Sequence, residues 1–174
     1  MTAGTETTTA TPGSTRLRPP RNPVDRRAVG WWTTDLLLLV AAPVVALVVL
    51  GVLIAPARIW LLAPALVIAA IGLAAAATLP RWWFTVHRWE VTDTAVYTRT
   101  GWFWQEWRVA PLSRIQTVDT RRGPVEQRFG LATVVVTTAS AKGSVTMAGL
   151  DHALAAEIAE QLTLITQAVP GDAT

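Results

Sequence analysis

The side chains that could support catalysis are few and lie far apart in this chain of 174 residues. The two histidines, His87 and His152, have 64 residues between them, and neither lies at metal-ligand spacing from a second histidine. There is no cysteine, and no Gly-x-Ser-x-Gly, Gly-x-Gly-x-x-Gly or Walker sequence occurs. The sequence therefore predicts a non-enzymatic protein without catalytic residues, cofactor or metal. A membrane-bound enzyme that uses His87 or His152 is the least favoured alternative.

Four arginines form the first candidate binding cluster: Arg114, Arg121, Arg122 and Arg128. They surround an expected turn at residues 122–124, where their guanidinium groups could bind the phosphate or carboxylate of an anion or lipid. An ordinary solvated turn has the same composition, and Asp119 and Glu126 are near enough in sequence to pair with these arginines. Both interpretations stay open at this point.

Aromatic residues form the second candidate surface: Trp102, Phe103, Trp104 and Trp107. Strand alternation would place Trp102 and Trp104 on one face, and Phe103 and Trp107 on the other. A small domain cannot bury both faces, so one pair should be exposed or rest on a membrane or a partner protein. Packing beneath a C-terminal helix is the alternative.

The elements that must position these residues begin with two charge-free apolar runs, residues 36–57 and 59–80, separated by Arg58. Each run of 22 residues would form a helix of about 33 Å, enough to cross a bilayer. Tryptophans at positions 31, 32, 60, 82 and 83 mark the expected water interfaces, as in an aromatic belt. We therefore predict a two-helix transmembrane hairpin over residues 31–80.

The excess positive charge lies in the N-terminal residues 1–30, which carry five arginines against Glu6 and Asp25. This segment has little to bury, so we expect a disordered basic tail on the cytoplasmic side. The arginines either set this topology or also bind anionic lipid headgroups. Two spans return the chain to the same side, which predicts a multi-pass cell-membrane protein with both termini cytoplasmic. Residues 81–174 hold nine basic and nine acidic groups, so nucleic acid is not an expected partner.

After Arg81 the pattern changes to short β-rich stretches separated by turn residues. Six strands are expected, at about residues 83–91, 95–100, 102–109, 114–120, 132–139 and 144–148. They suggest a meander that closes toward a barrel, with a short helical or irregular crossover at 125–131. Apolar residues then recur at helical spacing from Leu150 to Val169, with Asp151 as the N-cap. The domain should span 81–169, with a disordered tail at 170–174.

The stretch from Pro111 to Ser140 resembles the bacterial pleckstrin-homology family of YdbS-like membrane proteins. The matching elements are Pro-Leu-Ser-Arg-Ile-Gln at 111–116, Gly-Pro at 123–124, Arg-Phe-Gly-Leu at 128–131, Thr-Ala-Ser at 138–140 and Gly-Leu-Asp at 149–151. Two spans placed ahead of the domain also fit, and the resemblance covers about residues 31–166. It implies a membrane α hairpin plus an α+β domain, a pleckstrin-homology-like bent barrel of seven strands with a C-terminal amphipathic helix.

What the resemblance implies about function is a non-enzymatic membrane module that often accompanies a larger relative. In eukaryotic pleckstrin-homology domains, phosphoinositides bind to basic residues around the first hairpin turn. That turn here is Thr92-Asp93-Thr94 and carries an acid. Arg128 is the strongest of the four arginine candidates because it lies in the Arg-Phe-Gly-Leu element. We therefore expect a cytoplasmic domain that scaffolds or binds another membrane protein, with a larger relative or a second copy as partner. An anionic-lipid-sensing module is the alternative.

Overall fold

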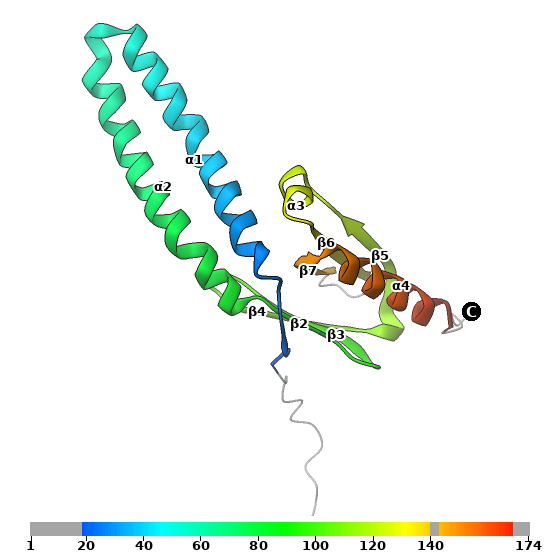
Figure 1. Ribbon diagram of the computed structural model, residues 1–174. Coiled ribbons are helices and arrows are strands. Elements are labelled where there is room, and N and C mark those ends of the chain that lie inside the picture. Colours follow the sequence, from blue (N-terminus) through cyan, green and yellow to red (C-terminus); the bar gives the residue numbers. More distant parts are fainter. Residues whose placement is uncertain (1–18, 140–142, 169–174) are drawn as a thin grey trace, which may run out of the picture.

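Two long helices form one end of the molecule in the computed structural model, which describes residues 19–139 and 143–168. Helix α1 (Arg27–Leu53) and helix α2 (Arg58–Val86) are joined by a short 3-10 helix, η1 (Ala55–Ala57). They run antiparallel and side by side away from the rest of the protein (Figure 1). Both helices are long and apolar enough to cross a membrane.

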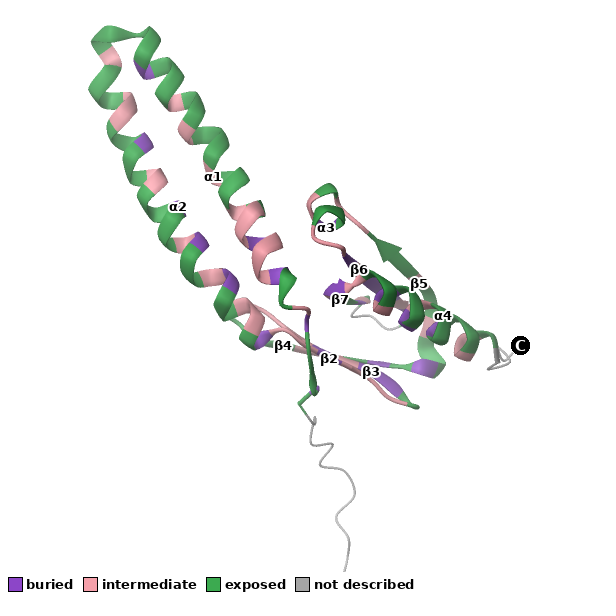
Figure 2. Ribbon diagram, viewed as in Figure 1, coloured by how far each residue is buried: buried purple, intermediate pink, exposed green. Residues whose placement is uncertain are grey.

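The two helices pack closely because small residues lie between them. A Cβ atom at Gly72 of α2 would lie 2.4 Å from a Val40 methyl carbon of α1, so only glycine permits this approach. The outward faces stay exposed along most of the hairpin (Figure 2). Leu39, Leu53 and Leu66 are each more than 70% exposed, at 73%, 73% and 72%. An apolar surface of this extent needs cover from lipid or from another protein.

The remainder of the chain forms two antiparallel sheets. The first contains, in spatial order, β1 (Asn22–Pro23), β2 (Arg88–Val91), β3 (Ala95–Thr100) and β4 (Glu106–Pro111). The second contains β5 (Ile115–Arg121), β6 (Leu131–Thr138) and β7 (Ser144–Asp151). The 3-10 helix η2 (Leu112–Arg114) connects the sheets, and α3 (Pro124–Arg128) lies between β5 and β6. Helix α4 (His152–Ala168) covers the second sheet (Figure 1).

Helix α4 completes the core from the C-terminal side. Ala155, Ile158 and Leu162 are buried at successive turns, against the sheet residues Leu131 and Leu150 in the same cluster. Its acidic residues lie elsewhere on the helix, and Asp151 accepts hydrogen bonds from the first-turn N–H groups. Of the positions that the sequence places on the apolar side of this helix, Ile158 and Leu162 are buried.

The structure confirms two long apolar helices joined to an antiparallel α+β domain, and it corrects several details. Residues 83–86 continue α2 and are not part of a strand, and the strand expected at 102–109 begins only at Glu106. No strand pairing within the described residues closes the two sheets into a barrel. Ser140, residues 1–18 of the expected tail and the tail at 170–174 lie outside the described residues.

The seventh strand comes from before the hairpin. Asn22 and Pro23 of β1 pair with Trp89 and Arg88 of β2, and Trp89 Nε1 donates a hydrogen bond to the Pro23 carbonyl at 3.1 Å. The segment that follows is also structural, because Val24, Ala28 and Trp32 are buried in the same core as the sheets. Residues 22–30, part of the segment expected to be a disordered tail, therefore include β1 and the start of α1, and residues 22–32, here called the entry segment, pack with the sheets.

A substitution at Gly149 should test this contact. Gly149 has φ +74°, and a Cβ atom there would lie 2.9 Å from Ala28 Cβ of the entry segment. Gly143 is the matched control, because its φ is +76° and nothing lies within 4 Å of an added Cβ. We expect Gly143→Ala to cost about 1 kcal/mol of folding stability from backbone strain. Gly149→Ala should cost roughly 1–3 kcal/mol more through overpacking. Thermal unfolding in detergent measures both, and equal losses would contradict this contact.

Candidate functional site

The C-terminal end of α2 is bound directly to the first sheet by Arg99. Its Nε donates to the Val86 carbonyl at 2.9 Å and its Nη2 to the Thr85 carbonyl at 3.2 Å, which satisfies carbonyls that the helix end leaves free. The same guanidinium lies over the Trp107 ring, 5.6 Å from the centroid. Arg99 therefore couples the second long helix to β3 and β4.

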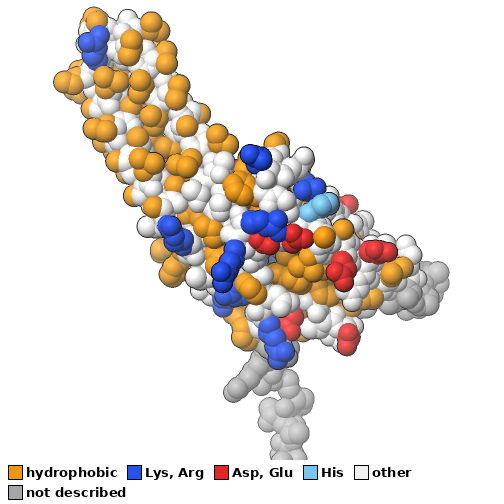
Figure 3. All heavy atoms as spheres, in the orientation of Figure 1, with side chains coloured by type: hydrophobic (Ala, Val, Ile, Leu, Met, Phe, Trp, Pro, Cys, Tyr) orange, Lys and Arg blue, Asp and Glu red, His pale blue; other side chains and the backbone are white. Residues whose placement is uncertain are grey.

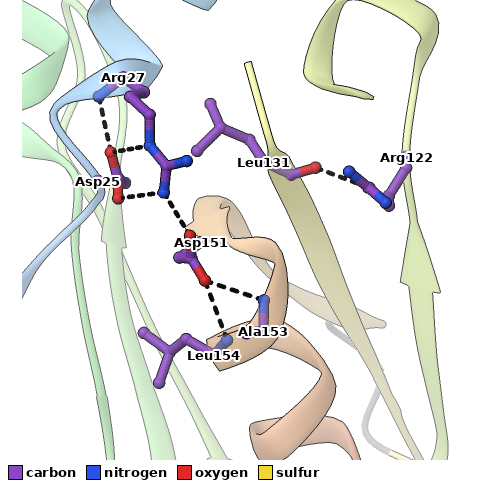
Figure 4. Close-up of polar contacts among 7 residues, drawn as sticks. All are labelled: Asp25, Arg27, Arg122, Leu131, Asp151, Ala153 and Leu154. Atoms are coloured by element: carbon purple, nitrogen blue, oxygen red, sulfur yellow. Dashed lines mark hydrogen bonds and ion pairs between the residues drawn. The ribbon is translucent and has the colours of Figure 1, made fainter. Parts of the chain in front are cut away.

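The start of α1 is bound to the second sheet by an arginine shared between two carboxylates (Figure 4). Arg27 donates from Nε and Nη2 to the two carboxylate oxygens of Asp25, both at 3.0 Å, and its Nη2 also pairs with Asp151. Asp151 uses its other oxygen to accept from the Ala153 N–H at 2.9 Å and the Leu154 N–H at 3.4 Å, capping α4. We call Asp25, Arg27 and Asp151 the clasp.

The clasp lowers the pKa of both of its acids. For Asp25 and for Asp151 the main cause is the hydrogen bond from the Arg27 side chain, and for Asp151 the N–H groups of α4 add to it. A carboxyl whose pKa falls on folding stabilises the folded state above its unfolded pKa, near 3.8. That contribution is lost as the pH falls below this value through the lower folded pKa.

The Arg-Phe-Gly-Leu element fastens α3 to the same region. The Phe129 ring packs on Gly30, where an added Cβ would lie 2.8 Å from a ring carbon. Gly130 lies beside Arg27 of the clasp, and its carbonyl accepts a hydrogen bond from the His152 N–H at 3.1 Å. Leu131 is completely buried. In the structure this element therefore joins α1, α3 and the start of α4.

The β3–β4 connection, residues 101–105, lies against the end of α2, and we call it the aromatic loop. The Trp82 indole N–H of α2 donates to the Trp102 carbonyl at 2.9 Å, which fixes the loop beside the helix. The Phe103 and Trp104 rings meet edge to face, with centroids 5.3 Å apart. Trp102, Phe103 and Trp104 are exposed, and Phe103 and Trp104 are 76% and 80% exposed. The loop thus presents aromatic rings next to the apolar hairpin.

Two hollows meet at Trp102. The first, here called the apolar groove, has a volume of about 410 Å³ and is lined by Leu79, Trp82, Trp102 and Phe103. The second, here called the junction pocket, has a volume of about 350 Å³ and is lined by Trp32, Trp83, His87, Gly101 and Trp102. Neither hollow is lined by a charged side chain. Together they follow the side of α2 from its apolar part to its end.

His87 lies at the end of α2 and not in a strand as expected. Its Nδ1 is 2.9 Å from the Trp83 carbonyl, which assigns the proton to Nδ1 in the neutral ring. Its ring lies 5.1 Å from the Trp32 ring, centroid to centroid. Burial lowers the pKa of His87, partly offset by the hydrogen bond to Trp83. The imidazole is therefore neutral at pH 7, and stability should decline as the pH falls below 6.5, because the unfolded chain takes up the proton first.

The four candidate arginines do not form one cluster. Arg114 and Arg121 lie at opposite ends of β5, a seven-residue strand, and so are about 20 Å apart. Arg122 donates from Nε to the Leu131 carbonyl at 3.0 Å, which gives it a structural partner. Arg121 and Arg128 are exposed near α3. Anion or lipid binding by any of the four stays a prediction.

The acids expected to pair with these arginines have other partners. Glu126 is buried and accepts hydrogen bonds at 2.6 Å from the Gly123 N–H and from the Thr133 hydroxyl, so it caps α3. Asp119 accepts from the Thr117 hydroxyl at 3.4 Å.

The first three aromatic candidates do not lie on a strand, contrary to the expectation from the sequence. Residues 102–104 form a bend, so alternation does not apply to them, and Trp107 is separated from the other three by its position under Arg99. The structure adds Trp82, Trp83 and Trp32 to this surface. Their double-Trp spacing at 31–32 and 82–83 signalled a membrane interface, but nothing in the sequence placed them beside residue 102. Contact with a membrane or partner stays a prediction.

The turn at Thr92–Thr94 lies at the opposite end of the β2–β3 hairpin from α2 (Figure 1). The Thr92 hydroxyl accepts from the Ala95 N–H at 3.1 Å, so the turn is bound locally. No group of three metal-ligating side chains was found within the described residues.

The fold has two apolar helices followed by two antiparallel sheets, with α4 over the second sheet. A comparison of the sequence with known protein families agrees with this pattern. The model of the family described as bacterial PH domain matches residues 34–164. This chain is a bacterial PH domain protein. Members of this family are in general not enzymes. No curated protein and no solved structure matches it. The matched region of the bacterial PH domain begins after the clasp residues Asp25 and Arg27, which the sequence analysis also missed.

Two substitutions of Asp151 separate the contribution of its ion pair with Arg27 from that of its capping of α4. Asp151→Asn keeps an oxygen for the α4 N–H groups but removes the ion pair, whereas Asp151→Ala removes both. We expect Asp151→Asn to lose less than about 1 kcal/mol, because the pair is partly exposed, and Asp151→Ala to lose about 1 kcal/mol more. Thermal unfolding at pH 7 measures both losses. The loss in Asp151→Asn should shrink at pH 3, and a loss that does not depend on pH would contradict an ionic clasp.

Proposed function

We propose that this protein is a non-enzymatic integral membrane protein that binds another membrane protein through the aromatic loop of its cytoplasmic PH-like domain. The observation that supports this most directly is the position of Phe103 and Trp104, exposed in the loop that lies beside the end of the long apolar helix α2. Contiguous exposed aromatic rings are typical of binding surfaces, and tryptophan is enriched among the residues that dominate binding energy.

The hairpin supports insertion in the membrane. Its side chains are apolar over nearly the whole length, and the basic group at the far tip is Arg58 (Figure 3). Charged side chains gather instead where the hairpin meets the domain (Figure 3). The excess of arginine before α1 favours a cytoplasmic location for that side, which puts both termini and the domain there.

The attachment of the domain favours a partner that is itself in the membrane. Arg99 joins the sheet to the end of α2, and the clasp joins α4 to the start of α1. Because both attachments restrict movement of the domain relative to the hairpin, the aromatic loop stays near the lipid–water interface. A larger PH-domain relative or a second copy of this chain fits that requirement.

The second candidate function is sensing of anionic lipid. Arg128 supports it, because it is exposed and precedes Phe129, whose ring packs on Gly30 one residue before the Trp31–Trp32 pair. The guanidinium is thereby near the level where anionic headgroups lie, and each such contact contributes about 1 kcal/mol.

Photo-crosslinking in cells with the full chain separates these functions. A photoreactive residue at position 104 should give a discrete crosslink to one integral membrane protein, and Phe103→Ala should weaken it several-fold. Position 60 is the matched control, because Trp60 is also 80% exposed but lies at the other end of α2. The same probe at position 128 reports on lipid. Crosslinks from 104 to lipid alone, or identical products from 104 and 60, would contradict partner binding.

A further inference from the structure

Two arginines lie side by side on the first sheet, next to the end of α2. Arg88 of β2 and Arg99 of β3 are cross-strand partners, so their side chains project from the same face, with Cβ atoms about 5 Å apart. Both guanidinium groups reach the last turn of α2. Arg88 donates to the Phe84 carbonyl at 3.4 Å, and Arg99 donates to the two carbonyls that follow it. Two positive charges are therefore held together at one point of the fold.

These two charges are not balanced by a carboxylate. Among the residues that the structure describes, no Asp or Glu forms an ion pair with either arginine. Glu90, on the same face of β2, lies two residues or about 7 Å further from α2. The helix end contributes only about half a negative charge, which leaves a net charge of roughly +1.5. Like charges at directly opposed strand positions are destabilising, so an anion bound between them would stabilise this pair.

Capping of α2 uses only part of the hydrogen-bonding capacity of the pair. Each guanidinium has five N–H groups, and the helix carbonyls accept one bond from Arg88 and two from Arg99. Trp107, the cross-strand partner of Arg99 in β4, supports the Arg99 guanidinium through a cation–π contact. Both arginines are partly exposed. Their remaining N–H groups suit the oxygens of a phosphate, which arginine binds through two parallel hydrogen bonds.

The depth of the pair along α2 indicates which phosphate can reach it. The charge-free run of α2 ends at Pro80, and the Phe84 carbonyl lies four residues or about 6 Å further along the helix. The headgroup layer on one side of a bilayer is about 5–8 Å thick, which is half the difference between the whole bilayer and its hydrocarbon core. The guanidinium groups at this end of α2 therefore lie at the level of lipid headgroups. Basic side chains gather at this level (Figure 3).

We propose that Arg88 and Arg99 bind the phosphate of an anionic phospholipid in the leaflet next to the domain. The inference rests on insertion of the hairpin in the membrane, but not on partner binding by the aromatic loop. It is also separate from lipid contact at Arg128, which lies at the end of α3. An anionic headgroup is favoured over a zwitterionic one, because an ammonium group would meet two guanidinium groups.

Native mass spectrometry of the full chain in dodecyl maltoside tests this site, with dioleoyl phosphatidylglycerol and dioleoyl phosphatidylcholine as probes. We expect phosphatidylglycerol to bind roughly tenfold more tightly than phosphatidylcholine. Arg88→Gln should weaken phosphatidylglycerol roughly fivefold, the size of one contact between an arginine and an anionic headgroup. Arg88→Lys keeps the charge and should retain most of the affinity. Arg114→Gln is the matched control, because it removes the same charge from an exposed position in η2 and should leave the affinity unchanged.

Three results would overturn the proposal. Equal losses in Arg88→Gln and Arg114→Gln would show a response to net charge alone. A loss confined to Arg128→Gln would assign the lipid to the region of α3. Glycerol 3-phosphate carries the phosphate without acyl chains, so at the concentration of the lipid it should not displace it, and displacement would exclude a lipid as the occupant. None of these results changes the protein crosslink expected from position 104, so the two proposals fail separately.

Discussion

The burial of the entry segment in the core of the two sheets is the contact on which the rest of the structure depends. Val24 and Trp32 are 5% and 9% exposed, and Ala28 is fully buried. Burying a side chain the size of valine or larger contributes about 1.5–3 kcal/mol, which is a large share of the stability of a small domain. The residues before the first long helix and in its first two turns thus help to complete the domain that follows the second, and the hairpin becomes an insertion within one folded unit.

This arrangement explains how the junction can be ordered. A helix that merely preceded a domain could pivot at its last residue, but α1 enters from β1 and the clasp while α2 leaves into β2 and Arg99. Two separate attachments oppose rotation of the hairpin against the sheets. The same attachments place the aromatic loop beside α2, so the surface proposed for the partner protein is a consequence of the way the hairpin is inserted.

Much of the fold could be predicted from periodicity, because the signals were local. The apolar runs, the strands expected at 95–100 and 144–148 and the spacing in α4 each reflect a single element. The errors occur where contacts between segments far apart in the sequence determine the local structure. Pro23 pairs with Arg88 of β2 and accepts a hydrogen bond from the Trp89 indole, and the end of α2 at residues 83–86 is capped by Arg99 from another strand. The candidate site was half predicted: residues 102–104 carried an aromatic signal, whereas their neighbours Trp32 and Trp83 are brought there by tertiary structure.

The central claim is that the hairpin and the PH-like domain form one body, and spin-label distances test it most directly. The chain has no cysteine, so Ile59→Cys and Gln161→Cys introduce two unique labels at exposed sites on α2 and α4. In liposomes containing the full chain, pulsed electron resonance should give one narrow distance distribution, which the added Val24→Asp broadens. A broad distribution in the otherwise unchanged chain would contradict the account, because it would show that the domain moves freely on its anchor.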